Sequence, residues 1–198
     1  MSNKTISFME KRDIAESARV LSIAMLDNPL HYGVYQSSDD KIRIDIEKDF
    51  LKLLKEKPGI VFIAKKEGNI IGVMRMKSCS HEKTTYINET VKDESNIEWR
   101  KSKWRNEWAS FDPQDQHWHL GPIGVLPTHQ GSGVGSTFMK RFCKEVDVCQ
   151  TSSYLETDKD INVSFYEKFG FKTIFESLIF DVKCRYMQRL SGVIQFQV

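Results

Sequence analysis

The sequence predicts one α/β domain whose mixed, mostly antiparallel sheet has a parallel pair in its middle and helices on both faces. At 198 residues the chain suits a single domain over residues 1–198. Strand and helix patterns follow in the order β-α-α-β-β-insert-β-α-β-α-β-β. The inner β-α-β unit predicts parallel strands, and the strands toward both ends are expected to pair antiparallel.

Composition excludes several classes of protein. The chain is 40% hydrophobic and 11% aromatic, as in globular proteins, and its net charge is only +2 with acids and bases interspersed. This argues against nucleic acid as a partner. The basic run from 100 to 105 is interrupted by Trp104 and balanced by Glu98 and Glu107, so we interpret it as a solvated helix face.

The N-terminal residues and the cysteines indicate in which cellular compartment the protein is expected. Residues 1–10 lack the pattern of a signal peptide, and no apolar run is long enough for a membrane span. The four cysteines are widely spaced and form no Cys-x-x-Cys. A reducing, cytoplasmic location is the simplest account, with the thiols as small apolar residues.

In the N-terminal part, residues 5–9 predict a strand. Asp13 is the expected N-cap of a first helix, with Glu16 completing a capping box, and Asn28-Pro29 ends that helix. Ser38 or Asp39 caps a second helix that stops at 57–59.

Two strands, 60–65 and 70–77, then flank a hairpin signal at 67–69. The polar segment 78–116 is an insert whose middle, 95–110, has a helical pattern. It either faces substrate or is a surface excursion. The aromatics of these regions either line an acceptor pocket or simply pack: Tyr32, Tyr35, Trp99, Trp104 and Trp108.

The C-terminal half carries the strongest patterns. A strand over 117–125 is interrupted by Gly121-Pro122, which weakens strand pairing and predicts a gap in the sheet. A helix over 136–146, a strand over 153–157 and a short helix over 162–169 follow. Runs 171–180 and 182–190 predict a closing antiparallel pair, and the β-rich end, 182–198, suits strand exchange in a homodimer.

A glycine-rich turn lies between the strand at 117–125 and its helix. A strand, such a turn and a helix start form a cradle for a phosphate, because glycines let the backbone approach an anion and helix N–H groups point at it. The lysine of a P-loop is absent, and the spacing differs from a dinucleotide fingerprint. The expected cofactor-binding residues are Gln130, Gly131, Ser132, Gly133, Val134, Gly135 and Ser136.

The spacing Q-x-x-G-x-G after an apolar strand resembles the acetyl-CoA loop of the GCN5-related N-acetyltransferase (GNAT) family. The second signature of that family, N-x-x-F-Y-E-x-x-G-F, matches residues 162–171, at the usual separation from the loop. The resemblance covers most of the chain by element order and residues 117–171 by motif. Within the family it is similar to the branch that contains puromycin N-acetyltransferase, and Asp27-Asn28-Pro29 is also like that branch.

The resemblance implies an enzyme that uses acetyl-CoA and transfers the acetyl group directly to a primary amine. It places the pyrophosphate on the glycine loop and pairs the pantetheine arm with Ile123, Gly124 and Val125. It makes Tyr166 the general acid for the departing thiolate. The alternative is a half-buried tyrosine whose hydroxyl only binds the cofactor.

The chemistry also needs a base for the amine. His119 and Glu156 are the candidates, and an ordinary polar role for His119 is the alternative. Asn162 is either a cofactor ligand or the N-cap of the short helix, since many family members carry their asparagine where this chain has Lys159. His117-x-His119 has the spacing of metal ligands, but no third ligand is evident, so we expect no metal.

Three functions remain open at this point. A small-molecule amine, antibiotic-like or metabolite-like, is the preferred acceptor. A protein or peptide amine is the first alternative. A non-catalytic acetyl-CoA sensor is the second, and the presence of Tyr166 argues against it.

Overall fold

The computed structural model describes residues 4–37, 39–57, 59–80 and 93–191. Its strands form one sheet in the order β1-β2-β3-β4-β5-β7-β6. Only β4 and β5 pair in parallel, and the other neighbours are antiparallel. The bounds are β1 (Lys4–Phe8), β2 (Ile60–Lys66), β3 (Asn69–Cys79), β4 (His117–Val125), β5 (Ser152–Thr157), β6 (Lys172–Ile179) and β7 (Val182–Arg189).

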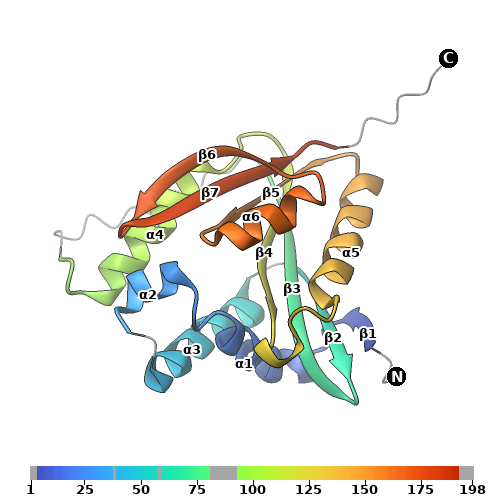
Figure 1. The fold of residues 1–198 in the computed structure, drawn as a ribbon, viewed down its shortest axis with the longest axis horizontal. Helices are drawn as coiled ribbons and strands as arrows, with labels where there is room; N and C mark the ends of the chain where they lie inside the picture. The colour runs from blue at the N-terminus through green and yellow to red at the C-terminus, as the bar shows by residue number, and fades with distance from the viewer. Residues whose placement is uncertain (1–3, 38, 58, 81–92, 192–198) are drawn as a thin grey trace.

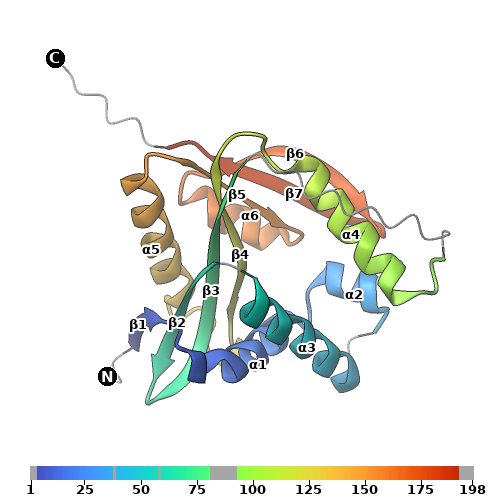
Figure 2. The same ribbon diagram turned by 180° about the vertical axis from the view of Figure 1, so that it is seen from behind.

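Helices cover both faces of this sheet, as Figures 1 and 2 show from opposite sides. Helices α5 and α6 lie on one face, and α1 to α4 lie on the other. The predicted fold class is therefore confirmed. The bounds are α1 (Ile14–Ala24), α2 (Pro29–Tyr35), α3 (Asp40–Glu56), α4 (Ile97–Phe111), α5 (Val134–Val148) and α6 (Asp160–Glu167), with short 3-10 turns η1 (Lys11–Asp13) and η2 (Pro127–His129).

Two-residue loops close both predicted hairpins. Glu67 and Gly68 connect β2 to β3, and Phe180 and Asp181 connect β6 to β7. All four residues have positive φ, as the turns that match the right-handed twist of paired strands require. The part of the predicted C-terminal run beyond residue 191, and residues 81–92 of the insert, lie outside the described residues.

The core has a layer on each side of the sheet. On one side, Phe138 and Phe142 of α5 pack with Met74 of β3 and with Tyr166 of α6. On the other side, the closely packed residues come from α1, α3, β2 and β3: Ala18, Leu21, Leu54, Ile63 and Val73. The alternation of β2 and β3 side chains between two apolar layers explains why both strands are apolar almost throughout.

Helix α2 was not expected from the sequence. Asn28-Pro29 was interpreted as the end of the first helix, but α1 already ends at Ala24. Asn28 is instead the N-cap of α2, where its side chain accepts a hydrogen bond from the N–H of His31 (3.0 Å). Pro29 is the first residue of α2, a position where a missing N–H costs nothing.

Asp13 is the N-cap residue of α1, as predicted, but its side chain forms no cap hydrogen bond there, and the predicted capping box with Glu16 is wrong. A 3-10 turn precedes α1, and the box is formed one turn earlier by Glu10 and Asp13, with the Glu10 N–H donating to Asp13 (2.9 Å). Glu16 accepts a hydrogen bond from the N–H of Ile70 (2.9 Å) and so joins α1 to β3. The prediction for Asp39 is confirmed, since its carboxylate accepts from the Ile42 N–H (3.0 Å).

The interpretation of the basic run as a solvated face is wrong for Arg100. This side chain is buried, and its guanidinium donates to the carbonyls of Val34 and Glu94. Lys101 forms an ion pair with Asp49 (2.7 Å). The Arg100–Val34 and Lys101–Asp49 contacts join α4 to α2 and α3, so α4 is an integral part of this layer.

Candidate active site

The sheet opens between β4 and β5. These strands pair only at His117↔Ser152, Trp118↔Ser153 and His119↔Tyr154, whereas β4 continues to Val125. Figure 1 shows β5, β7 and β6 turning away from the other four strands beyond this point. The gap begins where Gly121-Pro122 follows His119, as the sequence predicts.

Backbone groups of β4 face this gap. The N–H of Leu126 donates to the carbonyl of Ile71 on the β3 side (2.9 Å). In an antiparallel ladder, alternate residues point their backbone groups at the same neighbour. Gly124 therefore bonds to β3, and the N–H groups of Ile123 and Val125 point toward the gap.

Gly124 has a different role from its two neighbours. A Cβ at this position would lie 2.9 Å from the Cβ of Ala24 and 3.2 Å from Leu21. Glycine therefore allows α1 to approach β4 closely. Of the three expected pantetheine partners, only Ile123 and Val125 therefore point their backbone N–H groups toward the gap.

The glycine-rich loop leads directly into α5, which begins at Val134, two residues earlier than predicted. Gly131 and Gly133 have φ of +70° and +87°, and a Cβ at either position would meet only open space. The first backbone bond of α5 runs from the Thr137 N–H to the Gly133 carbonyl (3.0 Å). Within the described chain, the N–H groups of residues 131–136 donate to no other group. They form the expected anion cradle.

Three hydrogen bonds hold this loop. The Gln130 amide donates to the Val125 carbonyl (3.1 Å), which orients the loop against the end of β4. The Ser132 hydroxyl donates to the His129 carbonyl (2.5 Å), and the Lys4 ammonium donates to the Ser132 carbonyl (2.5 Å). The loop is thus shaped before any ligand arrives.

Tyr166 lies on α6, which packs beside the loop. A Cβ at Gly135 would be 3.4 Å from the ring of Phe165, so the start of α5 and α6 are in close contact. Tyr166 is 7% exposed, and its ring contacts Phe165 and Phe171. Burial, with a smaller effect of Asp158, raises the pKa of Tyr166 well above its usual range. The phenol is protonated at neutral pH, as an ordinary phenol is.

Asn162 is not the N-cap of α6. That position belongs to Lys159, whose carbonyl accepts from the Asn162 N–H (3.0 Å). Asn162 lies in the first turn of the helix, and its role toward a cofactor stays a prediction.

The two candidate bases are in contact. His119 Nε2 lies 2.7 Å from a carboxylate oxygen of Glu156, with side-chain exposures of 14% and 6%. If Nε2–H donates to the carboxylate, Nδ1 carries the lone pair, and Nδ1 is buried without a partner among the described residues. The pair thus has the arrangement of a base oriented by an acid.

Sequence reasoning missed Asp158, which directly follows β5. Its carboxylate accepts from the Asn28 amide (2.8 Å) and from the Leu30 N–H (2.9 Å), and so ties the start of α2 to the start of α6. Burial raises the pKa of this carboxyl. Its position at the carboxyl end of a parallel strand was the available signal, because sites of α/β sheets gather at that edge.

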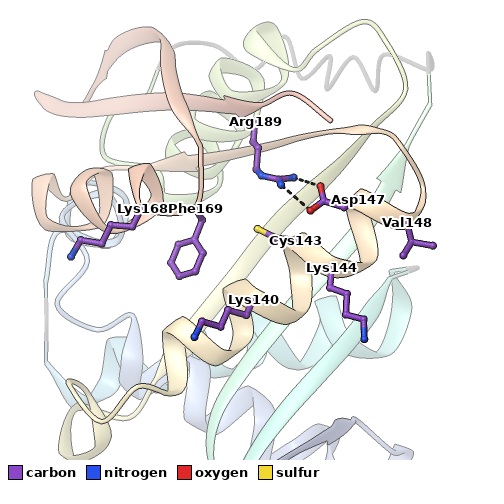
Figure 3. A pocket seen from close by; sticks show the side chains of 8 residues that line it. All are labelled: Lys140, Cys143, Lys144, Asp147, Val148, Lys168, Phe169 and Arg189. Carbon is purple, nitrogen blue, oxygen red and sulfur yellow. Dashed lines mark hydrogen bonds and ion pairs between the residues drawn. The ribbon is translucent and has the colours of Figure 1, made fainter. Parts of the chain in front are cut away.

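A hollow of about 690 Å³ lies between α5, the residues that follow α6, and the end of β7 (Figure 3). In Figure 3, Arg189 of β7 points at Asp147, and Lys140 and Lys144 extend from α5. The lining residues are Lys140, Cys143, Lys144, Asp147, Val148, Lys168, Phe169 and Arg189. Neither the glycine loop nor the His119–Glu156 pair contributes, so this hollow is separate from the candidate active site.

Comparison with known proteins identifies the family. A model of the acetyltransferase (GNAT) domain matches residues 57–173, more than half of the chain. The chain therefore belongs to the GNAT family and is an enzyme of the N-acetyltransferase class.

Solved structures share the fold at low identity. A Corynebacterium glutamicum protein named as histone acetyltransferase HPA2 and related acetyltransferase has a TM-score of 0.71 at 18% identity, with 98% of this chain and 99% of that chain covered. An agmatine N-acetyltransferase has a TM-score of 0.71 at 12% identity, covering 93% and 98%. A PaiA N-acetyltransferase from Thermoplasma acidophilum, in complex with coenzyme A, has a TM-score of 0.61 at 12% identity, with 95% of this chain and 99% of that chain covered.

The described helices include none long and apolar enough to cross a membrane.

Proposed function

We propose that this enzyme transfers the acetyl group of acetyl-CoA directly to the primary amine of a small molecule. One observation carries the proposal. The unbonded N–H groups of residues 131–136 and the gap-facing side of β4 lie at the ends of one continuous segment. An anion cradle joined to an open strand side fits a ligand with a pyrophosphate and an amide-bearing arm.

The residues fit this cofactor without rearrangement. Gly131 and Gly133 leave open space where a Cβ would stand, so backbone can approach the pyrophosphate. Ile123 and Val125 would donate N–H groups to the pantetheine arm. When bound, acetyl-CoA supplies the acetyl group as a reactive thioester.

The side chains near the gap supply proton transfers. His119, oriented by Glu156, would take the proton of the amine through Nδ1. Tyr166, whose phenol is protonated at neutral pH, would deliver a proton to the leaving sulfur. Direct transfer needs no covalent enzyme intermediate, because proximity supplies much of the acceleration.

The helices beside the gap favour a small acceptor. Asp158 fixes α2 to the β5–α6 connection, and Arg100 links α4 to the carbonyl of Val34 in α2. Asp112, which follows α4, acts electrostatically on both His119 and Glu156, so this layer adjoins the pair. Because α2 and α4 are held in place beside the gap, the site suits a compact amine better than an extended peptide. The agmatine enzyme, whose name gives a small molecule as acceptor, is consistent with this.

The test is a free-thiol release assay of the full chain with acetyl-CoA across small amines, aminonucleosides, polyamines and peptides. We expect release with a small amine, together with a mass gain of one acetyl group on that amine. Release with peptides alone would establish the protein acceptor instead. Cofactor binding without release across the whole panel would establish a sensor. Membership of the branch that contains puromycin N-acetyltransferase stays a prediction, which the aminonucleosides test.

A further inference from the structure

A second group of chemically active side chains lies around His117, two residues before His119 on β4. Cys79 ends β3 and is the direct cross-strand neighbour of His117. Asp112 is the C-cap of α4, and it brings a carboxylate to the same point. One donor atom from each of these three side chains lies within 4.8 Å of the other two. The three residues come from three different elements.

The hydrogen bond of His117 sets its ring for metal binding. Nδ1 lies 2.9 Å from the carbonyl of Asp115, and a carbonyl only accepts, so Nδ1 carries the proton. In the neutral ring, Nε2 then holds the lone pair. A backbone carbonyl on the other ring nitrogen is the usual outer partner of a metal-binding histidine.

Among the described residues, that lone pair has no hydrogen-bond partner. His117 is 2% exposed, and Nε2 has no hydrogen-bond partner among the described residues. The nearest carboxylate oxygen, Oδ1 of Asp112, is 3.8 Å away, beyond hydrogen-bond distance. A buried nitrogen without a partner is costly. The cost would be removed by a cation between Nε2 and Oδ1.

We propose that Cys79 Sγ, Asp112 and His117 Nε2 form a site for a divalent cation of the zinc class. Tetrahedral bonds of about 2.0–2.3 Å would place such ligand atoms about 3.3–3.8 Å apart. A nitrogen and an oxygen ligand would lie about 3.3–3.5 Å apart, so Nε2 and Oδ1, at 3.8 Å, need to approach each other by less than about 0.5 Å. Cys79 Sγ would lie about 3.5–3.7 Å from each of them and needs to approach by at most about 1.3 Å. A mixed sulfur, nitrogen and oxygen set selects zinc over magnesium or calcium.

Charged groups of both signs act on the site. Glu156 provides a negative charge near Cys79 and Asp112. Lys77 provides a positive charge beside Cys79, and His119 one beside Asp112 when it is protonated.

Three protein ligands leave a fourth position for water or another small ligand. The cation would fasten the end of α4 to the ends of β3 and β4. The cation would thereby hold the end of α4 in place beside His119, the proposed base. The inference is independent of the proposed acetyl transfer, because the site shares no residue with the cofactor loop or with Tyr166.

The test uses the full chain, stripped of metal with a chelator and titrated with Co²⁺ alone. We expect one equivalent to bind, with the visible bands of tetrahedral cobalt and a near-ultraviolet thiolate-to-cobalt band, and we expect Zn²⁺ to displace it. Cys79→Ser should remove the thiolate band. Cys79→Ser and His117→Gln should each weaken Zn²⁺ binding by more than the about 10- to 100-fold expected for loss of an outer-shell partner.

Cys149→Ser is the matched control, because Cys149 is the exposed free cysteine. It should leave the cobalt spectrum unchanged. Asp112→Asn supplies a second variant that keeps the shape of the side chain, in case the substitutions in the strands impair folding. The proposal is overturned if the wild-type chain gives no thiolate-to-cobalt band, or if the band survives in Cys79→Ser.

Discussion

At the scale of single residues, the contact between His119 and Glu156 leads to a kinetic prediction. His119→Ala should lower kcat by about 100-fold or more at neutral pH, because a positioned base contributes about 10²–10⁴. Rates of the variant should approach those of wild type at alkaline pH, where the amine loses its proton unaided. Glu156→Gln should cause a smaller loss, because the ring keeps a hydrogen-bond partner but loses the carboxylate.

The measurement is the pH–rate profile of both variants at saturating acetyl-CoA. Glu176→Gln is the matched control, since that carboxylate pairs with Lys183 on the surface (2.7 Å). A profile of His119→Ala that parallels wild type across the whole range would refute the base role.

Tyr166→Phe removes only the hydroxyl of a buried ring. We expect kcat to fall by about 100-fold with little change in the dissociation constant of acetyl-CoA, because a general acid acts in the transition state. Tyr186→Phe is the control, since it removes the hydroxyl of another buried tyrosine, on β7, whose partner is Ser177 (2.8 Å). Steady-state kinetics and calorimetric binding separate the roles. Unchanged kcat with weakened binding would reduce Tyr166 to a cofactor ligand.

His31 predicts a pH dependence of stability. Burial among rings, including those of Phe50 and Trp104, lowers its pKa from 6.5 to about 4, and Asp49 opposes this only in part. The folded state therefore binds fewer protons than the unfolded chain, so stability present at pH 7 is lost as pH falls through this window. The loss should be about 2 kcal/mol at pH 5 and about 3 kcal/mol at pH 4.

Urea unfolding of wild type and His31→Phe between pH 7 and pH 4 measures this loss. The variant keeps an aromatic ring and cannot titrate, so its advantage over wild type should grow as pH falls. A constant difference between the two chains would contradict the prediction.

The sequence predicted that His119 and Glu156 could serve the same site, but it did not predict which other side chains lie around them. His119 and Glu156 belong to neighbouring strands of a predictable crossover, so alternation alone brings their side chains to one face. Asp112 and Cys79 were not expected beside His117. Asp112 reaches that point through the direction of α4, and an insert's path over the sheet depends on tertiary contacts such as that of Arg100 with Val34.

At the scale of elements, the loop before α5 yields a prediction about glycine. Gly131→Ala and Gly133→Ala should each cost about 1–2 kcal/mol of stability, because a Cβ is strained at positive φ. Each should also weaken acetyl-CoA binding by more than about tenfold, since the methyl would lie where the ligand approaches.

Gly68→Ala is a close control. Gly68 has φ of +85°, and a Cβ there also meets only open space, but it lies in the β2–β3 hairpin. The Gly68→Ala variant should lose a similar amount of stability and should keep its affinity for acetyl-CoA. Equal affinity in all three variants would mean that the loop does not contact the cofactor.

The strongly patterned elements, such as α5 and the hairpins, were predictable because local propensity and tertiary packing agree there. The start of α2 was not. Asn28-Pro29 fits both the end of one helix and the start of the next. The half-buried carboxylate of Asp158, 130 residues away in the chain from Asn28, stabilises the second arrangement. Likewise Glu16 accepts from the Ile70 N–H of β3 and takes no part in a capping box, which Glu10 and Asp13 form instead.

At the scale of the whole molecule, the sheet consists of two parts joined by a short parallel contact. Only three residue pairs connect β4 to β5, whereas β3 and β4 share a long ladder. A ligand that pairs with β4 in the gap would add backbone bonds at the place where the sheet has fewest. Binding should therefore stabilise the fold, by about 2.7 kcal/mol at a ligand concentration of 100 times Kd.

Amide hydrogen exchange followed by NMR tests this at single residues. Without ligand, the amide of Gly124 should exchange slowly because it bonds to β3, and those of Ile123 and Val125 should exchange faster. Coenzyme A should slow Ile123 and Val125 more than it slows Gly124, because only their N–H groups face the gap. Uniform slowing of all three amides would reflect global stabilisation alone. It would exclude strand-like pairing of the pantetheine arm with β4, even if the cofactor binds tightly through the loop.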